Sequence, residues 1–276
     1  MNDVDIILPT YNCESYIEET IKSIIDQTLK NWKLIIIDDD SKDNSKKIIN
    51  KYANLSNVTT IFQKRKGLAI SNNIALKIAK GKYIMRLDAD DYLDNYAIQI
   101  MSEYLEKNSN YGLVYPDFYL VDLNGNIINI IRNNKIDKNS TLTNPANGAC
   151  TMFRTKFLKE IGGYNERYSC QDGLDIWLRY IKKYKVSNIN IPLFYYRRHG
   201  KNLTESKKKI VNSSEVIITI SSILVGFVIP EGVVKDFFTL KQSLEDGFNK
   251  GYELSNKITG KNAKGTIPTS NERSYA

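Results

Sequence analysis

Cysteine and histidine are scarce in this chain of 276 residues, which has three cysteines and a single histidine. Cys13, Cys150 and Cys170 are far apart and are not spaced as metal ligands, so we expect neither a disulfide framework nor a structural zinc site. No apolar run reaches the roughly 18 residues that a membrane-spanning helix needs. The acidic start, residues 1–5, lacks the basic-then-apolar pattern of a secretory signal. A reducing cytoplasm is therefore the expected location.

The overall composition is that of a folded chain with excess positive charge. Hydrophobic residues make up 42% and charged residues 25%, which excludes a disordered protein. The 39 Lys and Arg against 31 Asp and Glu give a net charge of +8. That charge fits an anionic partner or simply a solvated surface. The basic residues are scattered rather than clustered with aromatic residues, so we do not expect nucleic-acid binding.

Short apolar runs alternate with helical patterns through the first third of the chain. The predicted strands cover residues 4–9, 32–37, 58–63 and 82–87, and the predicted helices cover residues 15–28, 43–55 and 67–79. Continuously apolar strands at such intervals favour a parallel sheet with helices on both faces. Ligands of such sheets bind beyond the carboxyl ends of the strands.

Acidic clusters follow two of these strands. Asp38-Asp39-Asp40-Ser41 follows the second, and Asp88-Ala89-Asp90-Asp91 follows the fourth. The carboxylates of the Asp88 cluster can bind Mg²⁺ or Mn²⁺ and so reverse the local charge for a diphosphate. A carboxylate of the Asp38 cluster can instead accept an N–H of a nucleotide base. Each cluster taken alone is better explained as a polar turn whose aspartates cap the next helix.

The second half of the chain has a different pattern of predicted strands and helices from the first. Residues 112–117 and 118–122 are predicted strands, and Asn124-Gly125 predicts a hairpin return through residues 127–131. A helix is predicted over residues 174–184, with Trp177 on its buried side. Neither an activated nucleophile nor a glycine-rich loop after the first strand is present.

Seven motifs occur in order, and together they carry a resemblance. They are Pro9-Thr10-Tyr11-Asn12, Asp38 to Asp43, Lys66-Gly67-Leu68, Asp88-Ala89-Asp90-Asp91, Gly162 to Glu166, Gln171 to Leu178 and Tyr196-Arg197-Arg198-His199. This series resembles the family 2 glycosyltransferases of the GT-A fold over about residues 3–204. The resemblance implies an α/β fold: a mixed, mainly parallel GT-A sheet with helices on both faces.

The resemblance also implies a reaction. It predicts a metal-dependent, inverting transfer of a sugar from a nucleotide-diphosphate sugar, with UDP the first guess, to a hydroxyl of a saccharide or lipid-linked saccharide acceptor. It implies that the role lies in bacterial surface polysaccharide or glycolipid synthesis. The alternative is a sugar-phosphate nucleotidyltransferase. That class usually has a glycine-rich, basic loop after the first strand, which Pro9 to Glu14 is not.

Site residues follow from the matching positions. The resemblance implies a nucleotide site made of Pro9, Thr10, Tyr11, Asp39, Lys66, Gly67, Asp88 and Ala89. Asp90 and His199 would hold the Mn²⁺ or Mg²⁺ ion. Arg197 and Arg198 could pair with phosphate, or could simply be solvated residues at the end of a strand.

Asp172 would be the general base that deprotonates the acceptor hydroxyl. In the family an acidic pair commonly stands at this place, whereas here Gln171 precedes Asp172. Asp175 is therefore kept as the second candidate. At least one of the two aspartates is expected to serve the helix rather than the reaction.

We expect a catalytic domain over residues 1–204, with a nucleotide-binding half (1–91) and an acceptor half (92–204). Residues 205–254 are expected to pack on this domain or on a partner subunit, and 255–276 to be a disordered tail. Lys207-Lys208-Lys209 precedes an apolar stretch over 216–229, which is too short to span a bilayer. Peripheral contact with a membrane surface is the other interpretation of that stretch.

Overall fold

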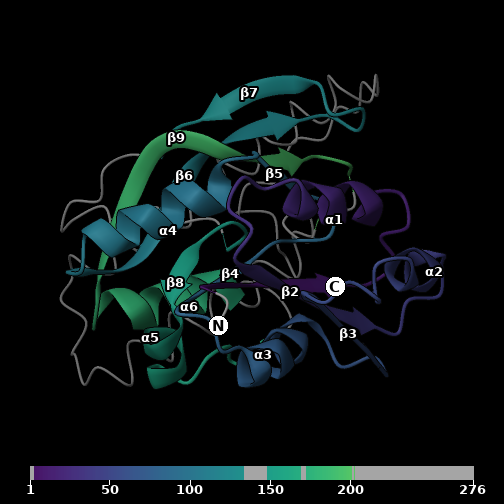
Figure 1. The fold of residues 1–276 in the computed structure, drawn as a ribbon, viewed down its shortest axis with the longest axis horizontal. Coiled ribbons are helices and arrows are strands. Elements are labelled where there is room, and N and C mark those ends of the chain that lie inside the picture. Colours follow the sequence, from purple (N-terminus) through teal and green to yellow (C-terminus); the bar gives the residue numbers. More distant parts are fainter. Residues whose placement is uncertain (1–2, 134–147, 169–171, 201, 203–276) are drawn as a thin grey trace, which may run out of the picture.

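The alternating strands and helices form one nine-stranded mixed sheet covered by helices on both faces (Figure 1). The computed structural model describes residues 3–133, 148–168, 172–200 and 202. In chain order the elements are β1 (Val4–Thr10), α1 (Ile17–Ile25), β2 (Trp32–Asp39), α2 (Ser45–Asn50), β3 (Val58–Gln63), α3 (Leu68–Ile78), β4 (Tyr83–Arg86), β5 (Tyr92–Leu93), α4 (Ala97–Lys107), β6 (Tyr111–Val121), β7 (Ile127–Ile131), β8 (Met152–Arg154), α5 (Thr155–Glu160), α6 (Asp172–Ile181) and β9 (Lys185–Arg197).

The sheet order is β3-β2-β1-β4-β8-β6-β9-β5, and β7 pairs with the outer part of β6. The first four strands in this order are parallel to one another. β8 lies antiparallel between β4 and β6, whereas β6 and β9 run parallel to each other. β5 closes the far side by pairing antiparallel with β9. This mixed, mainly parallel α/β sheet is the predicted fold class.

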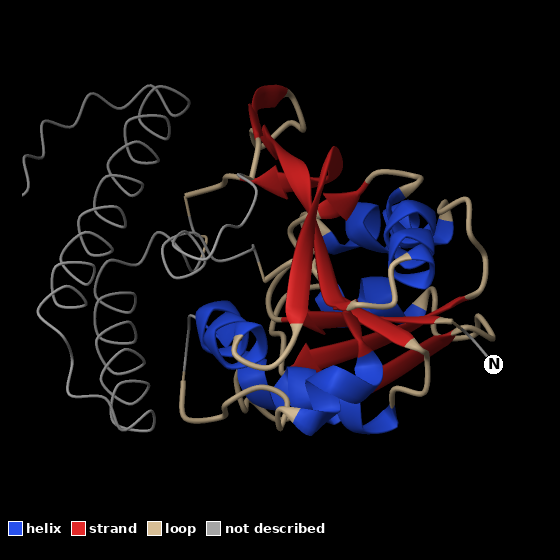
Figure 2. Ribbon diagram, turned by 90° about the vertical axis from the view of Figure 1, so that its left-hand side faces the viewer, coloured by secondary structure: helices blue, strands red, loops and turns tan. Residues whose placement is uncertain are grey.

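Successive side chains along each strand point to opposite faces of the sheet and pack into two separate hydrophobic cores. Ile6 and Leu8 of β1 pack with helices α1, α2 and α4 on one face of the sheet. Ile7 of the same strand packs with α3, α5 and α6 on the other face, where Trp177 is among the largest buried side chains. Figures 1 and 2 show the helices on opposite sides of the strands. Burial on both faces explains why β1 and β2 contain continuous apolar runs, such as residues 6–8 and 34–37, instead of alternating polar and apolar residues.

The predicted elements of the first 90 residues are confirmed, with ends shifted by a few residues. The two strands predicted over 112–122 are one strand, β6, which continues through Pro116. Its pairing with β9 shifts register between Pro116 and Asp117, where a proline has no N–H to give to the ladder. Helices α4 and α5 and strands β5, β8 and β9 were not predicted.

Within the ranges described, none of the helices is both long enough and apolar enough to traverse a lipid bilayer. The expected extension over 205–254, its basic and apolar stretch, and the expected tail over 255–276 lie outside the described residues, so their assignments stay predictions.

The topology of the sheet places the loops that contain the predicted site residues close to one another. The carboxyl ends of β1, β2, β3 and β4 meet at one edge of the sheet because these strands are parallel and adjacent. β5 begins just after the second acidic cluster and pairs with the end of β9, with Tyr92 opposite Tyr195. The residues that follow β9 therefore arrive beside the second acidic cluster.

Candidate active site

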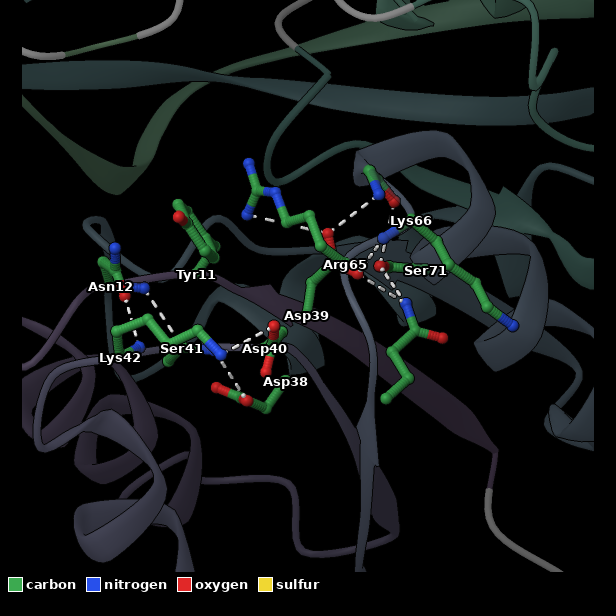
Figure 3. Close-up of polar contacts among 12 residues, drawn as sticks. Tyr11, Asn12, Asp38, Asp39, Asp40, Ser41, Lys42, Arg65, Lys66 and Ser71 are labelled. Atoms are coloured by element: carbon green, nitrogen blue, oxygen red, sulfur yellow. Dashed lines mark hydrogen bonds and ion pairs between the residues drawn. The ribbon is translucent and has the colours of Figure 1, made fainter.

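The loops after β1 and β2 are joined to each other by hydrogen bonds. The Asn12 N–H donates to Ser41 Oγ at 2.9 Å, and the Lys42 N–H donates to Asn12 Oδ1 at 2.8 Å (Figure 3). Thr10, at the end of β1, stands opposite Asp38 of β2. The backbone of the predicted nucleotide motif, Pro9 to Asn12, is thereby fixed at the carboxyl edge of the sheet.

Asp39 is buried and organises the loop after β3 (Figure 3). Its Oδ1 accepts the Lys66 N–H at 2.7 Å and Gln63 Nε2 at 2.8 Å, and its Oδ2 accepts the Gly67 N–H at 2.8 Å. Gly67 has φ +96°, a left-handed conformation that a side chain would strain. Because an ionised carboxylate offers about four acceptor positions, Asp39 keeps capacity for one ligand donor.

Arg65, which the sequence reasoning did not single out, lies between Tyr11 and Asp39 (Figure 3). Its guanidinium carbon is 3.2 Å from the centroid of the Tyr11 ring, and Arg65 Nη1 is 3.6 Å from Asp39 Oδ2. Tyr11 is 41% exposed. A flat cation thus lies on an exposed aromatic face beside a carboxylate, an arrangement that also suits a planar heterocycle with an N–H group. Its position next to Lys66 was the signal available in the sequence.

A buried arginine fixes Asp88. Arg86, in β4, places Nε 2.8 Å from Asp88 Oδ1 and Nη2 3.2 Å from Asp88 Oδ2. The ion pair, together with the Nη2–Oδ2 hydrogen bond, restrains the Asp88 carboxylate. Next to it, the buried Ala89 accepts a hydrogen bond from Thr20 Oγ1 of α1 at 3.0 Å. Arg86 was also missed, although it stands only two residues before Asp88.

Asp90 and His199 meet across 109 residues of sequence. His199 Nε2 lies 2.8 Å from Asp90 Oδ2. The imidazole also stacks on Tyr16, with ring centroids 5.2 Å apart and planes 20° from parallel. The structure therefore brings together the two residues that were predicted to share a metal ion.

Negative charge accumulates at this edge. Burial raises the pKa of the Asp91 carboxyl well above its usual range, and Asp90 and Asp88 raise it further. Burial together with Asp90 likewise raises the pKa of the half-buried Cys13 thiol to about 12. Burial is the main cause of both shifts, and the neighbouring carboxylates add to it because they make further negative charge unfavourable here.

The two candidate bases have different surroundings. Asp175 is buried in α6 and pairs with Arg179, whose Nε is 2.9 Å from Asp175 Oδ2. The same guanidinium donates to the carbonyls of Ile161 and Gly163 at 2.7 and 2.8 Å. Asp175 therefore anchors the loop before α6. Asp172 is the first residue of α6, and its side chain is outside the description.

One expectation is wrong. Arg197 does not point to a phosphate site, because its Nε, Nη1 and Nη2 are engaged by the carbonyls of Asp90 and Leu123 and by Glu19. Its side chain is only 3% exposed. Arg198 donates its N–H to the Val121 carbonyl at 3.0 Å.

The family profile described as "Glycosyl transferase family 2" matches residues 5–162. The chain belongs to glycosyl transferase family 2. It is therefore a glycosyltransferase by family, as the motif series predicted. The matched segment contains the loops after β1 to β4, including Asp39, Asp88 and Asp90.

Curated relatives of this glycosyltransferase include proteins named as synthases and as a glucosyltransferase. It is 30% identical over 223 residues to "Chondroitin synthase" of Escherichia coli, covering 76% of this chain and 32% of that protein. It is 28% identical to "Hyaluronan synthase" of Pasteurella multocida, covering 92% of this chain and 26% of that protein. It thus spans a third or less of these two. It is 32% identical to "UDP-Glc:alpha-D-GlcNAc-diphosphoundecaprenol beta-1,3-glucosyltransferase WfaP" of Escherichia coli, with 80% and 87% covered.

Solved structures support the GT-A fold of the glycosyltransferase. The crystal structure of residues 1–349 of TarS from S. aureus in complex with UDP superposes with a TM-score of 0.62 at 20% identity, covering 93% of this chain and 73% of that one. The complex of the same protein with UDP-GlcNAc gives 0.65 at 19% identity. At such identity the likeness shows the fold alone.

The glycosyltransferase has residues that fit a divalent cation. Adjacent ligands of an octahedral Mg²⁺ or Mn²⁺ with bonds of about 2.1 Å lie about 3 Å apart, close to the 2.8 Å between Asp90 Oδ2 and His199 Nε2. A carboxylate and an imidazole suit Mn²⁺. Among the described residues no group of three or more His, Cys, Asp or Glu side chains is placed to hold a metal.

Proposed function

We propose that this glycosyltransferase moves a sugar from a UDP-sugar to an acceptor hydroxyl with inversion of the anomeric carbon, and that it depends on Mn²⁺ or Mg²⁺. One observation carries the proposal. An aromatic face and carboxylate (Tyr11 and Asp39), a fixed carboxylate (Asp88) and a carboxylate–imidazole pair (Asp90 and His199) follow one another along a single edge of the sheet.

In this series, Tyr11 and Asp39 form the part of the site proposed for the nucleobase. In the proposal the uracil ring lies on Tyr11, its N–H donates to Asp39, and Pro9 and Thr10 form the wall beneath. Arg65 occupies this space beside the tyrosine and moves aside or covers the base. The backbone at Lys66 and Gly67 lines the remaining side, since Asp39 holds it there.

The diphosphate end is the second acidic cluster. Asp88 and Ala89 would face the ribose, and Asp90 with His199 would hold the metal ion. When bound, such an ion supplies positive charge that stabilises the leaving diphosphate. Arg86 keeps the Asp88 carboxylate in one orientation, and the Tyr16 ring supports the imidazole of His199.

On the acceptor side, Asp172 would take the proton of the attacking hydroxyl. The oxygen then attacks the anomeric carbon from the face opposite the diphosphate, which inverts that centre in a single displacement. A positioned base typically contributes about 10²–10⁴ in rate. Asp175 is not suited to this role because Arg179 engages its carboxylate.

The acceptor is proposed from the relatives. A lipid-linked saccharide is named as the acceptor of WfaP, and two polysaccharide synthases are among the other relatives. We therefore propose a saccharide or lipid-linked saccharide acceptor in bacterial surface polysaccharide or glycolipid synthesis. Action at the inner face of the membrane, in the cytoplasm, and assembly into oligomers remain part of this proposal.

The test is a thermal-shift panel of UDP-, dTDP-, GDP- and CMP-sugars with and without Mn²⁺. A ligand at 100 times its dissociation constant stabilises a protein by about 2.7 kcal/mol, enough to identify the donor. UDP-sugars are expected to stabilise the protein in Mn²⁺ and much less in EDTA. Stabilisation by a nucleoside triphosphate with a sugar 1-phosphate, followed by pyrophosphate release, would instead indicate a nucleotidyltransferase.

A further inference from the structure

Arg197, the last residue of β9, joins three separate parts of the molecule at the cation site. Its Nε donates to the Asp90 carbonyl at 3.0 Å and its Nη1 donates to the Leu123 carbonyl at 3.1 Å. Its Nη2 is 2.5 Å from Glu19 Oε2 of α1. The side chain thus connects the second acidic cluster, the turn between β6 and β7, and the first helix.

The backbone of Arg197 continues this network to His199. The Arg197 N–H donates to Asp91 Oδ1 at 2.9 Å. The Arg197 carbonyl accepts Asn202 Nδ2 at 2.8 Å, and Asn202 Oδ1 in turn accepts the His199 N–H at 3.0 Å. Both halves of the Asp90–His199 pair are therefore tied to one residue: Asp90 through its carbonyl, and His199 through the turn that Asn202 closes.

The surroundings keep the guanidinium in place. The Tyr16 and Tyr92 rings have centroids 5.1 and 5.2 Å from the guanidinium carbon. Tyr16 also stacks on the His199 ring. The planar guanidinium of an arginine can donate to three acceptors on three separate segments at once. The compact ammonium of a lysine cannot reach all three together.

We propose that Arg197 is a positioning residue that sets the Asp90 carboxylate and the His199 imidazole at the separation a divalent cation requires. The inference rests on the proposed metal-dependent function. It assigns Arg197 no contact with the sugar nucleotide. Loss of the three contacts of the Arg197 guanidinium should weaken binding of the cation. It should have less effect on the part of the site proposed for the nucleobase.

The single histidine makes a direct test feasible. In untagged protein labelled with isotopic histidine, the only ring signals in an NMR spectrum belong to His199. Mn²⁺ is paramagnetic, so titrating it should broaden these signals in the wild type, and excess Mg²⁺ should restore them. The Mn²⁺ concentration that halves the signal is the measurement.

Arg197→Lys is expected to raise this half-point about tenfold or more, and Asn202→Ala at least threefold. Glu19→Gln alters a side chain that is 54% exposed, so it gives the same test with little risk to folding, again with a rise of about threefold. Arg154→Lys is the matched control. Arg154 also holds backbone carbonyls, those of Tyr111 and Leu105, but lies on β8 away from the site, so its half-point should equal that of the wild type.

The outcomes separate the two proposals. If Mn²⁺ does not broaden His199 in the wild type, the proposed metal site is wrong, whatever the variants do. If it does, and folded Arg197→Lys or, where that variant does not fold, Glu19→Gln keeps the wild-type half-point, the positioning role of Arg197 is refuted. An equal rise in Arg154→Lys would also refute it, because the effect would then be general loosening.

Discussion

Two aspartates three residues apart, Asp172 and Asp175, should respond in opposite ways to the same change. We predict that Asp172→Asn lowers turnover by about 10²–10⁴ and leaves stability and UDP binding as in the wild type. Asp175→Asn should instead lower the free energy of unfolding, because the carboxylate of Asp175 is the buried partner of Arg179. The pair is a matched comparison on one helix.

The expected loss of stability follows from the contacts of Arg179. Two unit charges about 4 Å apart at an effective dielectric constant of about 20 attract each other by about 4 kcal/mol. The Arg179 side chain is 31% exposed, so solvent screens part of this attraction. An asparagine also keeps one hydrogen bond to the guanidinium. A net loss of about 2–3 kcal/mol remains, which corresponds to a fall in melting temperature of roughly 4–12 °C for a domain of this size.

Chemical denaturation gives the free energy of unfolding, and release of UDP from the donor in the presence of acceptor gives turnover. The measurements should be made well below the melting temperature of Asp175→Asn, so that loss of folded protein is not taken for loss of catalysis. The reasoning is refuted if Asp175→Asn is as stable as the wild type yet loses turnover by 10² or more. Near-normal turnover of Asp172→Asn would remove it as the base.

Three further predictions concern the donor side. Asp39→Ala should weaken UDP and UDP-sugar binding alike and cost about 2–3 kcal/mol of stability, because two backbone N–H groups lose charge-assisted hydrogen bonds; calorimetry showing unchanged UDP affinity would contradict this. Asp90→Ala should weaken UDP binding far more in Mn²⁺ than in EDTA, and equal losses would argue against a metal role. The Cys13 thiol, with a pKa of about 12, should exchange with a small disulfide at pH 8 roughly 30-fold more slowly than free cysteine, since less thiolate outweighs higher nucleophilicity; peptide mass spectrometry showing equal rates would contradict the shift.

Much of the nucleotide-binding half could be predicted from the sequence. Its central strands β1 and β2 are buried on both faces, so they contain continuous apolar runs, and its helices have a regular apolar period. The acidic clusters follow directly from those strands, so the rule that ligands bind at the carboxyl edge already placed Asp39 and Asp90 near each other. The resemblance then gave each of these residues an expected role.

The acceptor half was harder to predict. β9 includes exposed and half-buried positions, because parts of it lie outside the two cores, and it shows no simple alternation. Its register with β5 is a property of pairing between segments about 100 residues apart, which local patterns do not encode. Arg65 and Arg86 were missed, and Arg197 was given the wrong partner, for the same reason: the role of each arginine depends on the residues that folding brings to it.

The order of residues alone determined the class of fold, the family and the identity of the carboxylates at the sheet edge, because these depend on local periodicity and on motifs that are contiguous in the chain. Only the tertiary structure decided which charges neutralise one another. It directed Arg197 inward to Asp90 and Glu19 rather than outward to a phosphate, engaged Asp175 with Arg179, and brought His199 to Asp90. Electrostatic pairing acts through space over a few ångströms, and distance along the chain does not set it.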